Sequence, residues 1–252
     1  MKNSVFISGS ISIGKLPELV KQSIDNIIKR DIGILVGDAN GVDTLVQNYC
    51  TFRKYFDLTV YSILPIPRYK ADGRFKLRYI EVKESIKKKR ERQTEKDKSM
   101  AIDSEFSFII WDSKSKGSYA NIMRAIDLEK GTKIFLAEKD DFLTQDQITR
   151  NNVEFIYRDH NGYSAAEAVE LLKESGFSKF KGSRDFYQYL RNQSIIRKIN
   201  SVYCPLSEYE HLFFIEKYRG KAKGIKFRNE FISWIKNNIQ EFQTPTQPNL
   251  FT

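Results

Sequence analysis

Short runs of β-branched and aromatic residues alternate with helically spaced apolar residues over the first 140 or so residues of the chain. Strands are expected at 5–8, 33–36, 58–63, 106–111 and 132–136. Helices are expected over Leu16–Ile28, from Val42 onward and over 119–130. Strands that alternate with helices form parallel sheets, so the pattern predicts an α/β fold over residues 1–145: a Rossmann-like, doubly wound parallel sheet. A long polar segment between the third and fourth strands interrupts the alternation.

A polar stretch at residues 141–152 marks the end of this alternation and predicts a domain boundary. A smaller, mainly helical domain is expected over 153–240. Residues 153–157 form either a last strand of the first domain or a lead-in to the second. Residues 241–252 are rich in proline and are expected to form a flexible tail.

The second domain has the sequence signals of a winged helix-turn-helix. Ser164 and Glu167 have the spacing of a capping box, and the helix that they begin ends at Gly176. A second helix at 184–193 is followed by a hairpin of 195–199 and 202–204. One more amphipathic helix carries an aromatic and apolar stripe, which packs either into the core or against a second copy of the chain: Phe227, Phe231, Trp234, Ile235 and Ile239.

Composition excludes several classes of protein. Hydrophobic residues make up 40% of the 252 residues, enough for a packed core. No run of about 18 apolar residues is present, so we expect no membrane span, and the chain begins with a strand rather than a signal peptide. Cys50 and Cys204 lie far apart, which favours a reducing cytoplasm. The two histidines of the chain, His160 and His211, argue against a His-rich metal site and against most His-based catalytic triads. We expect neither a metal nor a cofactor.

The net charge of +10 is concentrated in two stretches. Residues 68–98 hold thirteen Lys and Arg against six Asp and Glu, and residues 179–228 hold twelve against four. Basic charge gathered in this way favours a polyanionic partner.

Three loops rich in glycine and small polar residues, 8–12, 37–43 and 111–118, follow predicted strands. Because the carboxyl ends of parallel strands lie at one edge of a sheet, we expect these loops to meet. Gly and Ser let backbone amides approach an anion, and a helix N-terminus favours negative charge. The loops therefore predict a nucleotide or sugar-phosphate site built from Gly9, Ser10, Ser12, Gly37, Asp38, Gly41, Asp43, Asp112, Ser115, Gly117, Ser118 and Asn121.

The same loops carry a family resemblance over just over half of the chain. Their motifs are Gly-Ser-x-Ser from Gly9, Gly-Asp-Ala-x-Gly-x-Asp from Gly37, and Trp-Asp-x-x-Ser-x-Gly-Ser-x-x-Asn from Trp111. Together they resemble the SLOG superfamily of Rossmann-like domains, which includes relatives of the cytokinin-activating phosphoribohydrolases and of competence DNA-processing proteins. The resemblance implies binding of a nucleotide or nucleotide-derived signal, and some relatives cleave the base from a nucleoside monophosphate.

One departure bears on catalysis. Relatives that cleave the glycosidic bond carry Gly-Gly-x-Gly-Thr-x-x-Glu at the third loop, and Asn121 stands where the Glu is expected. An amide cannot act as a carboxylate nucleophile or base. If cleavage occurs, Asp112 is our first candidate for the catalytic carboxylate and Asp38 the second, while Asp43 is equally suited to capping the following helix.

The C-terminal domain resembles the small winged-helix domains at the ends of phage antirepressor-type proteins. The resemblance rests on Ser164–Leu172, Gly176–Ser178 and the hairpin at 195–204. It implies nucleic-acid binding through basic residues of the second helix and the wing, namely Lys179, Lys181, Arg184, Arg191, Arg197 and Lys198. A helical dimerisation module with solvated charges is the alternative, and a homo-oligomer is expected.

Gln247, Leu250 and Phe251 in the tail resemble the Gln-x-x-Leu-Phe peptide that docks on the bacterial sliding clamp, which makes the clamp a candidate partner. Three functions therefore stay open. The chain is a nucleotide-binding sensor or defence-type effector that also binds nucleic acid, a nucleotide N-glycosidase, or a DNA-binding protein whose Rossmann domain is a scaffold. Asn121 favours the first over the second, and the three loops favour both over the third.

Overall fold

A computed structural model describes residues 3–241 and divides into two compact units between Glu154 and Phe155. The division falls inside helix α5 (Arg150–Asn161), close to the polar stretch that the sequence marks as the boundary. Each unit has its own hydrophobic core. No helix in the described part of the chain is long and apolar enough to span a membrane.

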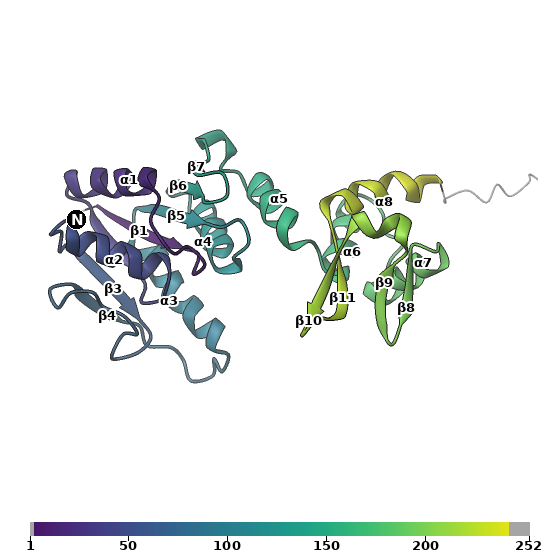
Figure 1. Ribbon diagram of the computed structural model, residues 1–252, viewed down its shortest axis with the longest axis horizontal. Helices are drawn as coiled ribbons and strands as arrows, with labels where there is room; N and C mark the ends of the chain where they lie inside the picture. The colour runs from purple at the N-terminus through teal and green to yellow at the C-terminus, as the bar shows by residue number, and fades with distance from the viewer. Residues whose placement is uncertain (1–2, 242–252) are drawn as a thin grey trace, which may run out of the picture. The chain divides into compact units, whose positions relative to one another are not determined.

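Unit 1 is built on a seven-stranded sheet in the order β4-β3-β2-β1-β5-β6-β7, parallel except for β7 (Figure 1). Its strands are β1 (Ser4–Gly9), β2 (Gly33–Val36), β3 (Leu58–Ser62), β4 (Lys76–Tyr79), β5 (Phe106–Trp111), β6 (Gly131–Leu136) and β7 (Asp141–Phe142). From β1 the chain builds outward through β2, β3 and β4, and then returns to the other side of β1 with β5. The predicted Rossmann-like α/β fold is confirmed.

Helices cover both faces of this sheet. Alternate residues of a strand point to opposite faces, so Val5 and Ile7 of β1 join the core with α1 (Glu18–Lys29) and α2 (Val42–Phe52). Phe6 points the other way and packs with Met100 of α3 (Lys89–Asp103). The remaining helix, α4 (Lys116–Asp127), follows β5. Buried on both faces, the central strands read as continuous apolar runs.

The structure resolves two segments that the sequence leaves irregular or open. The polar segment after β3 is not an interruption, because it supplies the edge strand β4 and the helix α3. Residues 153–157 lie in α5 and not in a strand. Val153 and Tyr157 are buried four residues apart while Phe155 is 57% exposed, which is helical and not alternating burial.

Unit 2 contains helices, two separate two-stranded hairpins and a last helix. Its elements are α6 (Ala165–Glu174), α7 (Ser183–Asn192), β8 (Ile196–Ile199), β9 (Val202–Pro205), β10 (Phe213–Tyr218), β11 (Lys221–Phe227) and α8 (Asn229–Glu241). Short 3-10 helices cover Gln145–Gln147 in unit 1 and Ser207–Leu212 in unit 2. His211 lies in the second of these, and His160 lies in α5. The predicted order of helix, helix and hairpin is confirmed, and the second hairpin was not foreseen.

Local signals in unit 2 match the structure closely. The Ser164 hydroxyl accepts the amide of Glu167, and the Glu167 carboxylate accepts the amide of Ser164, the predicted capping box. Phe227 lies in β11 rather than in the last helix, because it pairs with Phe213 across the second hairpin. Phe231, Ile235 and Ile239 of α8 are buried in the core, so the apolar stripe packs within the unit.

Candidate functional site

The chain changes direction across the sheet between β1 and β5, and open α/β sheets bind ligands at this switch point, beyond the carboxyl ends of the strands. A cleft of about 680 Å³ lies here, walled by the loops after β1 and β5 and by α3 and α4. Nine of the twelve predicted ligand residues line it: Gly9, Ser10, Ser12, Asp43, Asp112, Ser115, Gly117, Ser118 and Asn121. The cleft does not include Gly37, Asp38 or Gly41.

A network of hydroxyl groups around Asp112 ties the two loops together. The carboxylate accepts hydrogen bonds from Ser10 Oγ at 2.9 Å, from Ser12 Oγ at 2.6 Å and from the amide of Ser115 at 2.7 Å. Ser10 Oγ also lies 2.7 Å from Ser115 Oγ and 3.2 Å from Ser118 Oγ. Burial opposes ionisation of Asp112, but these hydrogen bonds outweigh it and hold its pKa below the usual value. The Asp112 carboxylate therefore holds the loops after β1 and β5 together through these hydrogen bonds.

The N-terminus of α4 opens directly into this cleft. Its N-cap residue, Ser115, makes no side-chain capping bond, since its hydroxyl is engaged with Ser10 and Ser118. Gly117 lies in the first turn, and a Cβ placed on it would meet no atom within 4 Å. The first turn, which lines the cleft, thus has no side-chain cap and open space beside Gly117, and Lys116 adds an exposed positive charge there. This arrangement suits an anion.

Asp38 is held in a buried ion cluster beneath the loops. Its side chain is 1% exposed and lies 3.0 Å from Lys96 Nζ, 2.6 Å from Arg68 Nη2 and 2.9 Å from Ser62 Oγ. Burial alone would raise its pKa, but the hydrogen bonds and the charges of Arg68 and Lys96 bring the pKa well below the usual value. With every carboxylate oxygen engaged by cations or donors, Asp38 acts as an anchor between β2, α3 and the loop carrying Arg68.

Two other carboxyl groups line the cleft, and their pKa values are raised rather than lowered. Burial raises the pKa of Asp43 to about 6, against the opposing effect of Lys96. Burial likewise raises the pKa of Asp97, on α3. The Asp43 carboxylate accepts the amide of Ala39 at 3.1 Å and lies so close to Gly37 that a Cβ there would be 2.3 Å from Oδ2. The cleft therefore holds two carboxyl groups whose pKa values burial raises, that of Asp43 to about 6, and raised carboxyl pKa values are a property of acid–base sites.

Two buried apolar side chains also line the cleft. Phe6 and Met100, each at most 2% exposed, form part of its wall, together with Ser8 and Thr94. Ser8 is 5% exposed, and within the described part of the chain its hydroxyl has no hydrogen-bond partner. A buried hydroxyl without a partner is costly, so this one is well placed for a polar atom of a bound molecule.

Sequence reasoning missed the wall contributed by α3. Lys89, Arg90, Gln93 and Asp97 all line the cleft. They come from the polar segment between the third and fourth predicted strands, for which the sequence predicted no helix. The one available signal was the spacing of Lys96, Met100 and Ala101, which are the buried residues of this helix.

Gly41 and Gly9 serve the packing of the loops. Gly41 has φ +79°, and a Cβ on it would lie 2.6 Å from the Ile11 Cα. A Cβ on Gly9 would lie 2.4 Å from the Ile110 oxygen and 2.5 Å from Val42 Cγ2. Both glycines allow backbone to approach backbone. Gly41→Val would therefore disturb the fold of these loops as well as the predicted ligand site, because valine disfavours this φ and has no room.

Asn121 lies on the cleft side of α4, 8% exposed, and its Oδ1 accepts Arg124 Nη1 at 2.6 Å. Among the described residues, no group of three His, Cys, Asp or Glu side chains is placed to hold a metal ion.

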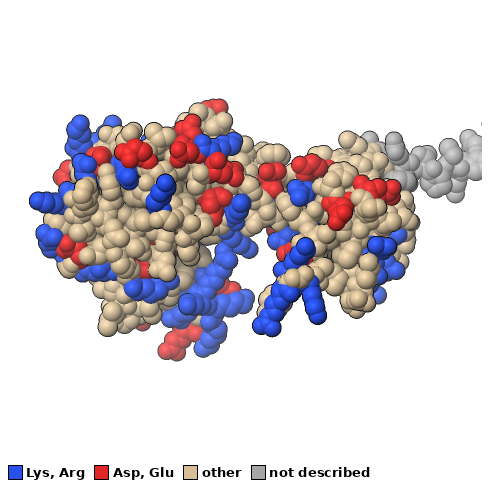
Figure 2. Space-filling model, viewed as in Figure 1, with Lys and Arg blue, Asp and Glu red and all other residues tan. Residues whose placement is uncertain are grey.

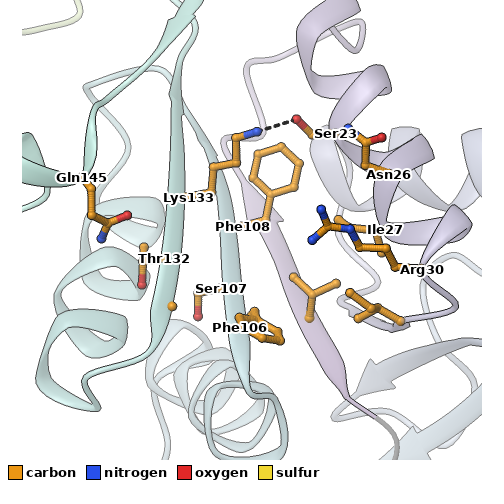
Figure 3. Close-up of a pocket in the computed structure, with 13 residues that line it drawn as sticks. Ser23, Asn26, Ile27, Arg30, Phe106, Ser107, Phe108, Thr132, Lys133 and Gln145 are labelled. Carbon is orange, nitrogen blue, oxygen red and sulfur yellow. Dashed lines mark hydrogen bonds between the residues drawn. The ribbon is translucent and has the colours of Figure 1, made fainter.

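A second cavity, of about 390 Å³, lies at the amino ends of β5 and β6 and shares no lining residue with the cleft. Figure 3 shows Asn26 and Ile27 of α1, and Arg30 just after this helix, around the cavity beside Phe108 of β5. Lys133 donates to Ser23 Oγ at 2.9 Å across its upper end. The positive charges here stand apart from the loop residues that the sequence singled out.

The basic residues predicted to bind nucleic acid are all exposed on unit 2: Lys179, Lys181, Arg184, Arg191, Arg197 and Lys198. On α7, Arg184, Gln188 and Arg191 are spaced to share one exposed face, opposite the buried Phe186 and Leu190. Gln247, Leu250 and Phe251 of the clamp-binding prediction lie outside the described residues.

Comparisons with protein-family models, curated proteins and solved structures gave no match to this chain.

Proposed function

We propose that unit 1 binds a nucleotide or nucleotide-derived ligand in the cleft between the loops, α3 and α4. The observation that carries the proposal is the N-terminus of α4, whose first turn has no side-chain cap and lines a cleft that the apolar Phe6 and Met100 also line. The helix N-terminus would bind the anionic part of such a ligand, and the apolar side chains would contact its flat base. The resemblance of the loops to the SLOG superfamily supports the same ligand class.

The phosphate of this ligand lies against the first turn of α4, near Gly117 and Lys116. Arg68, Lys89 and Arg90 at the rim raise the local positive potential and attract the anion. The base lies deeper, against Phe6 and Met100, where the Ser8 hydroxyl and the carboxyl of Asp97 supply hydrogen-bonding groups for its edge.

The test is isothermal titration calorimetry of the full chain with a panel of nucleoside mono-, di- and triphosphates. We expect Gly117→Val to weaken binding of the best nucleotide by at least about tenfold, because its side chain would occupy the anion position. The thermal midpoint of unit 1 should stay unchanged, since the site of the new Cβ is open. Gly73→Val is the matched control, because a Cβ there also meets no atom within 4 Å and Gly73 is outside the cleft. Unchanged affinity in Gly117→Val contradicts the proposal.

Hydrolysis of the N-glycosidic bond is the second candidate activity of this cleft. It is favoured by the carboxyl groups of Asp43 and Asp97, which face the cleft with raised pKa values, whereas Asp38 is held by cations and Asp112 by hydroxyls. Chromatography of the same nucleoside monophosphates after incubation with the protein detects any released base. Release that is lost in Asp43→Asn or Asp97→Asn assigns the activity to these residues, and no release from any substrate leaves a binding function.

We further propose that unit 2 binds nucleic acid, which makes the chain a sensor or effector that couples a nucleotide signal to a nucleic acid in the cytoplasm. The exposed stripe of Arg184, Gln188 and Arg191 on α7 supports this, as do Arg197 and Lys198 on β8. The free state of both cysteines is in keeping with a reducing compartment. A double Arg184→Ala, Lys198→Ala variant that binds DNA as tightly as the parent would refute this surface.

A further inference from the structure

The hairpin of β10 and β11 in unit 2 ends in a tight turn. Tyr218 and Lys221 form its last pair, so Arg219 and Gly220 alone make the loop. Their φ angles are +49° and +79°. Positive φ at both central residues is the geometry of the two-residue turn that best matches the twist of a β-hairpin. The end of the ribbon is therefore a defined structure and not a loose loop.

Four cations stand on this end of the hairpin. Lys217, Arg219, Lys221 and Lys223 are exposed, and no Asp or Glu lies between residues 217 and 223. In the described part of the chain none of the four forms an ion pair, whereas Lys226, nearer the core, lies 3.4 Å from Glu216. Figure 2 shows the resulting group of Lys and Arg side chains on the projecting part of the hairpin. Uncompensated charge of one sign on a narrow ribbon creates a positive potential that attracts a polyanion.

The ribbon carries positive charge on both faces. Its register shifts between Glu216 and Lys217, so that Glu216 pairs with Gly224 and Lys217 with Ala222, leaving Lys223 as an extra residue on β11. Lys217 therefore lies on the face of Ile215, while Lys221 lies with Tyr218 on the opposite face. Contact with phosphates on one side would engage the cations of one face only. Cations on both faces therefore favour a partner that has phosphates on both sides of the ribbon.

We propose that the β10–β11 hairpin enters the major groove of B-form DNA, with Lys217 and Lys221 contacting the phosphates on its two sides and Arg219 reaching the base edges. A two-stranded ribbon fits this groove, which is about 12 Å wide, and arginine is the commonest side chain to read guanine there. The major groove of A-form RNA is too narrow to admit it. This inference rests on the proposed nucleic-acid function of unit 2 and assigns a different element as its reading part.

The neighbouring hairpin supports the assignment. β9 contacts β11, and the turns of both hairpins point the same way from the core of unit 2 (Figure 1). Arg197 and Lys198 on β8 are exposed on this β8–β9 hairpin. A duplex held by the β10–β11 hairpin would present its backbone to these residues.

The experiment is fluorescence anisotropy of the full chain with a labelled 24-base-pair DNA duplex, the same sequence as double-stranded RNA, and the single DNA strand. The variant is a quadruple Lys217→Ala, Arg219→Ala, Lys221→Ala, Lys223→Ala chain. Its control loses the same charge from exposed lysines of unit 1, through Lys15→Ala, Lys29→Ala, Lys54→Ala and Lys139→Ala. Circular dichroism confirms that each variant is folded.

We expect the parent to bind duplex DNA more tightly than double-stranded RNA. The hairpin variant should lose on the order of 100-fold in affinity at about 0.15 M salt. Its plot of log affinity against log salt should be shallower by about two, since the phosphate contacts of Lys217 and Lys221 are lost and each removes roughly 0.9 from the slope. The control should bind as the parent does.

Equal affinity of parent and hairpin variant for duplex DNA overturns the inference, and so does equal binding of double-stranded RNA by the parent. If the Arg184→Ala, Lys198→Ala variant alone loses binding, unit 2 binds nucleic acid through α7 and β8 and only the hairpin assignment fails. If the parent binds none of the three nucleic acids, both the hairpin assignment and the nucleic-acid part of the proposed function fail, while the nucleotide cleft stands on its own calorimetric test.

Discussion

At the scale of single residues, Asp43 couples the cleft to pH. Burial raises the pKa of its carboxyl to about 6 from the ordinary 3.8, so the folded protein binds this proton more tightly than the unfolded chain does. The stability that this proton provides is fully present below about pH 4 and is lost as the pH rises through 6. At neutral pH the ionised carboxyl is a buried charge only partly compensated by Lys96.

We therefore expect Asp43→Asn to gain stability relative to the parent as the pH rises from 4 to 7, by about 2 kcal/mol over that interval. Urea unfolding of both proteins at several pH values measures the difference. Asp140→Asn is the control, because Asp140 is exposed and lies outside the cleft. A constant difference between Asp43→Asn and the parent across this range would show that the carboxyl titrates normally.

At the scale of elements, the sequence predicted the helices and strands that carry a local signal. β1 and β2 contain short apolar runs, and the start of α6 is marked by Ser164 and Glu167. Helix α3 was not predicted from the sequence because it is mostly charged. It is fixed to the sheet by the ion pair of Lys96 with Asp38, and the spacing of apolar residues does not reveal such a contact. The cleft was predicted on the side of the loops, where local motifs specify it, and missed on the side of α3, where only the tertiary fold brings the wall into place.

The buried pair of Lys96 and Asp38 predicts how α3 is held. Lys96→Met should destabilise unit 1 by about 3 kcal/mol, because it leaves the buried Asp38 carboxylate with Arg68 as its remaining cation. Lys98→Met on the same helix makes the identical chemical change at an exposed position, and should cost under about 1 kcal/mol. Denaturant unfolding followed by near-ultraviolet circular dichroism compares the two, and equal losses of stability would contradict the anchoring role of Lys96.

At the scale of the whole molecule, each hydrophobic cluster lies within a single unit. Those of unit 1 are made by residues between Val5 and Phe142, and that of unit 2 by residues between Tyr163 and Ile239. The cleft belongs to the first unit and the basic hairpins to the second. Ligands that bind only one folded unit stabilise that unit, by an amount set by their concentration relative to Kd. The two proposed binding functions are therefore separable in a single thermal unfolding experiment.

Differential scanning calorimetry of the full chain should resolve two transitions. Phe186 is fully buried among Phe180, Phe227 and Phe231, so Phe186→Ala should destabilise unit 2 by about 3–5 kcal/mol and lower one transition alone. A nucleotide at about 100 times its Kd should raise the other transition, by roughly 2.7 kcal/mol of added stability, and duplex DNA should raise the one that Phe186→Ala lowers. Phe155→Ala, at an exposed position, serves as the control. A nucleotide that shifts the transition lowered by Phe186→Ala would place its binding site in unit 2 and not in the cleft.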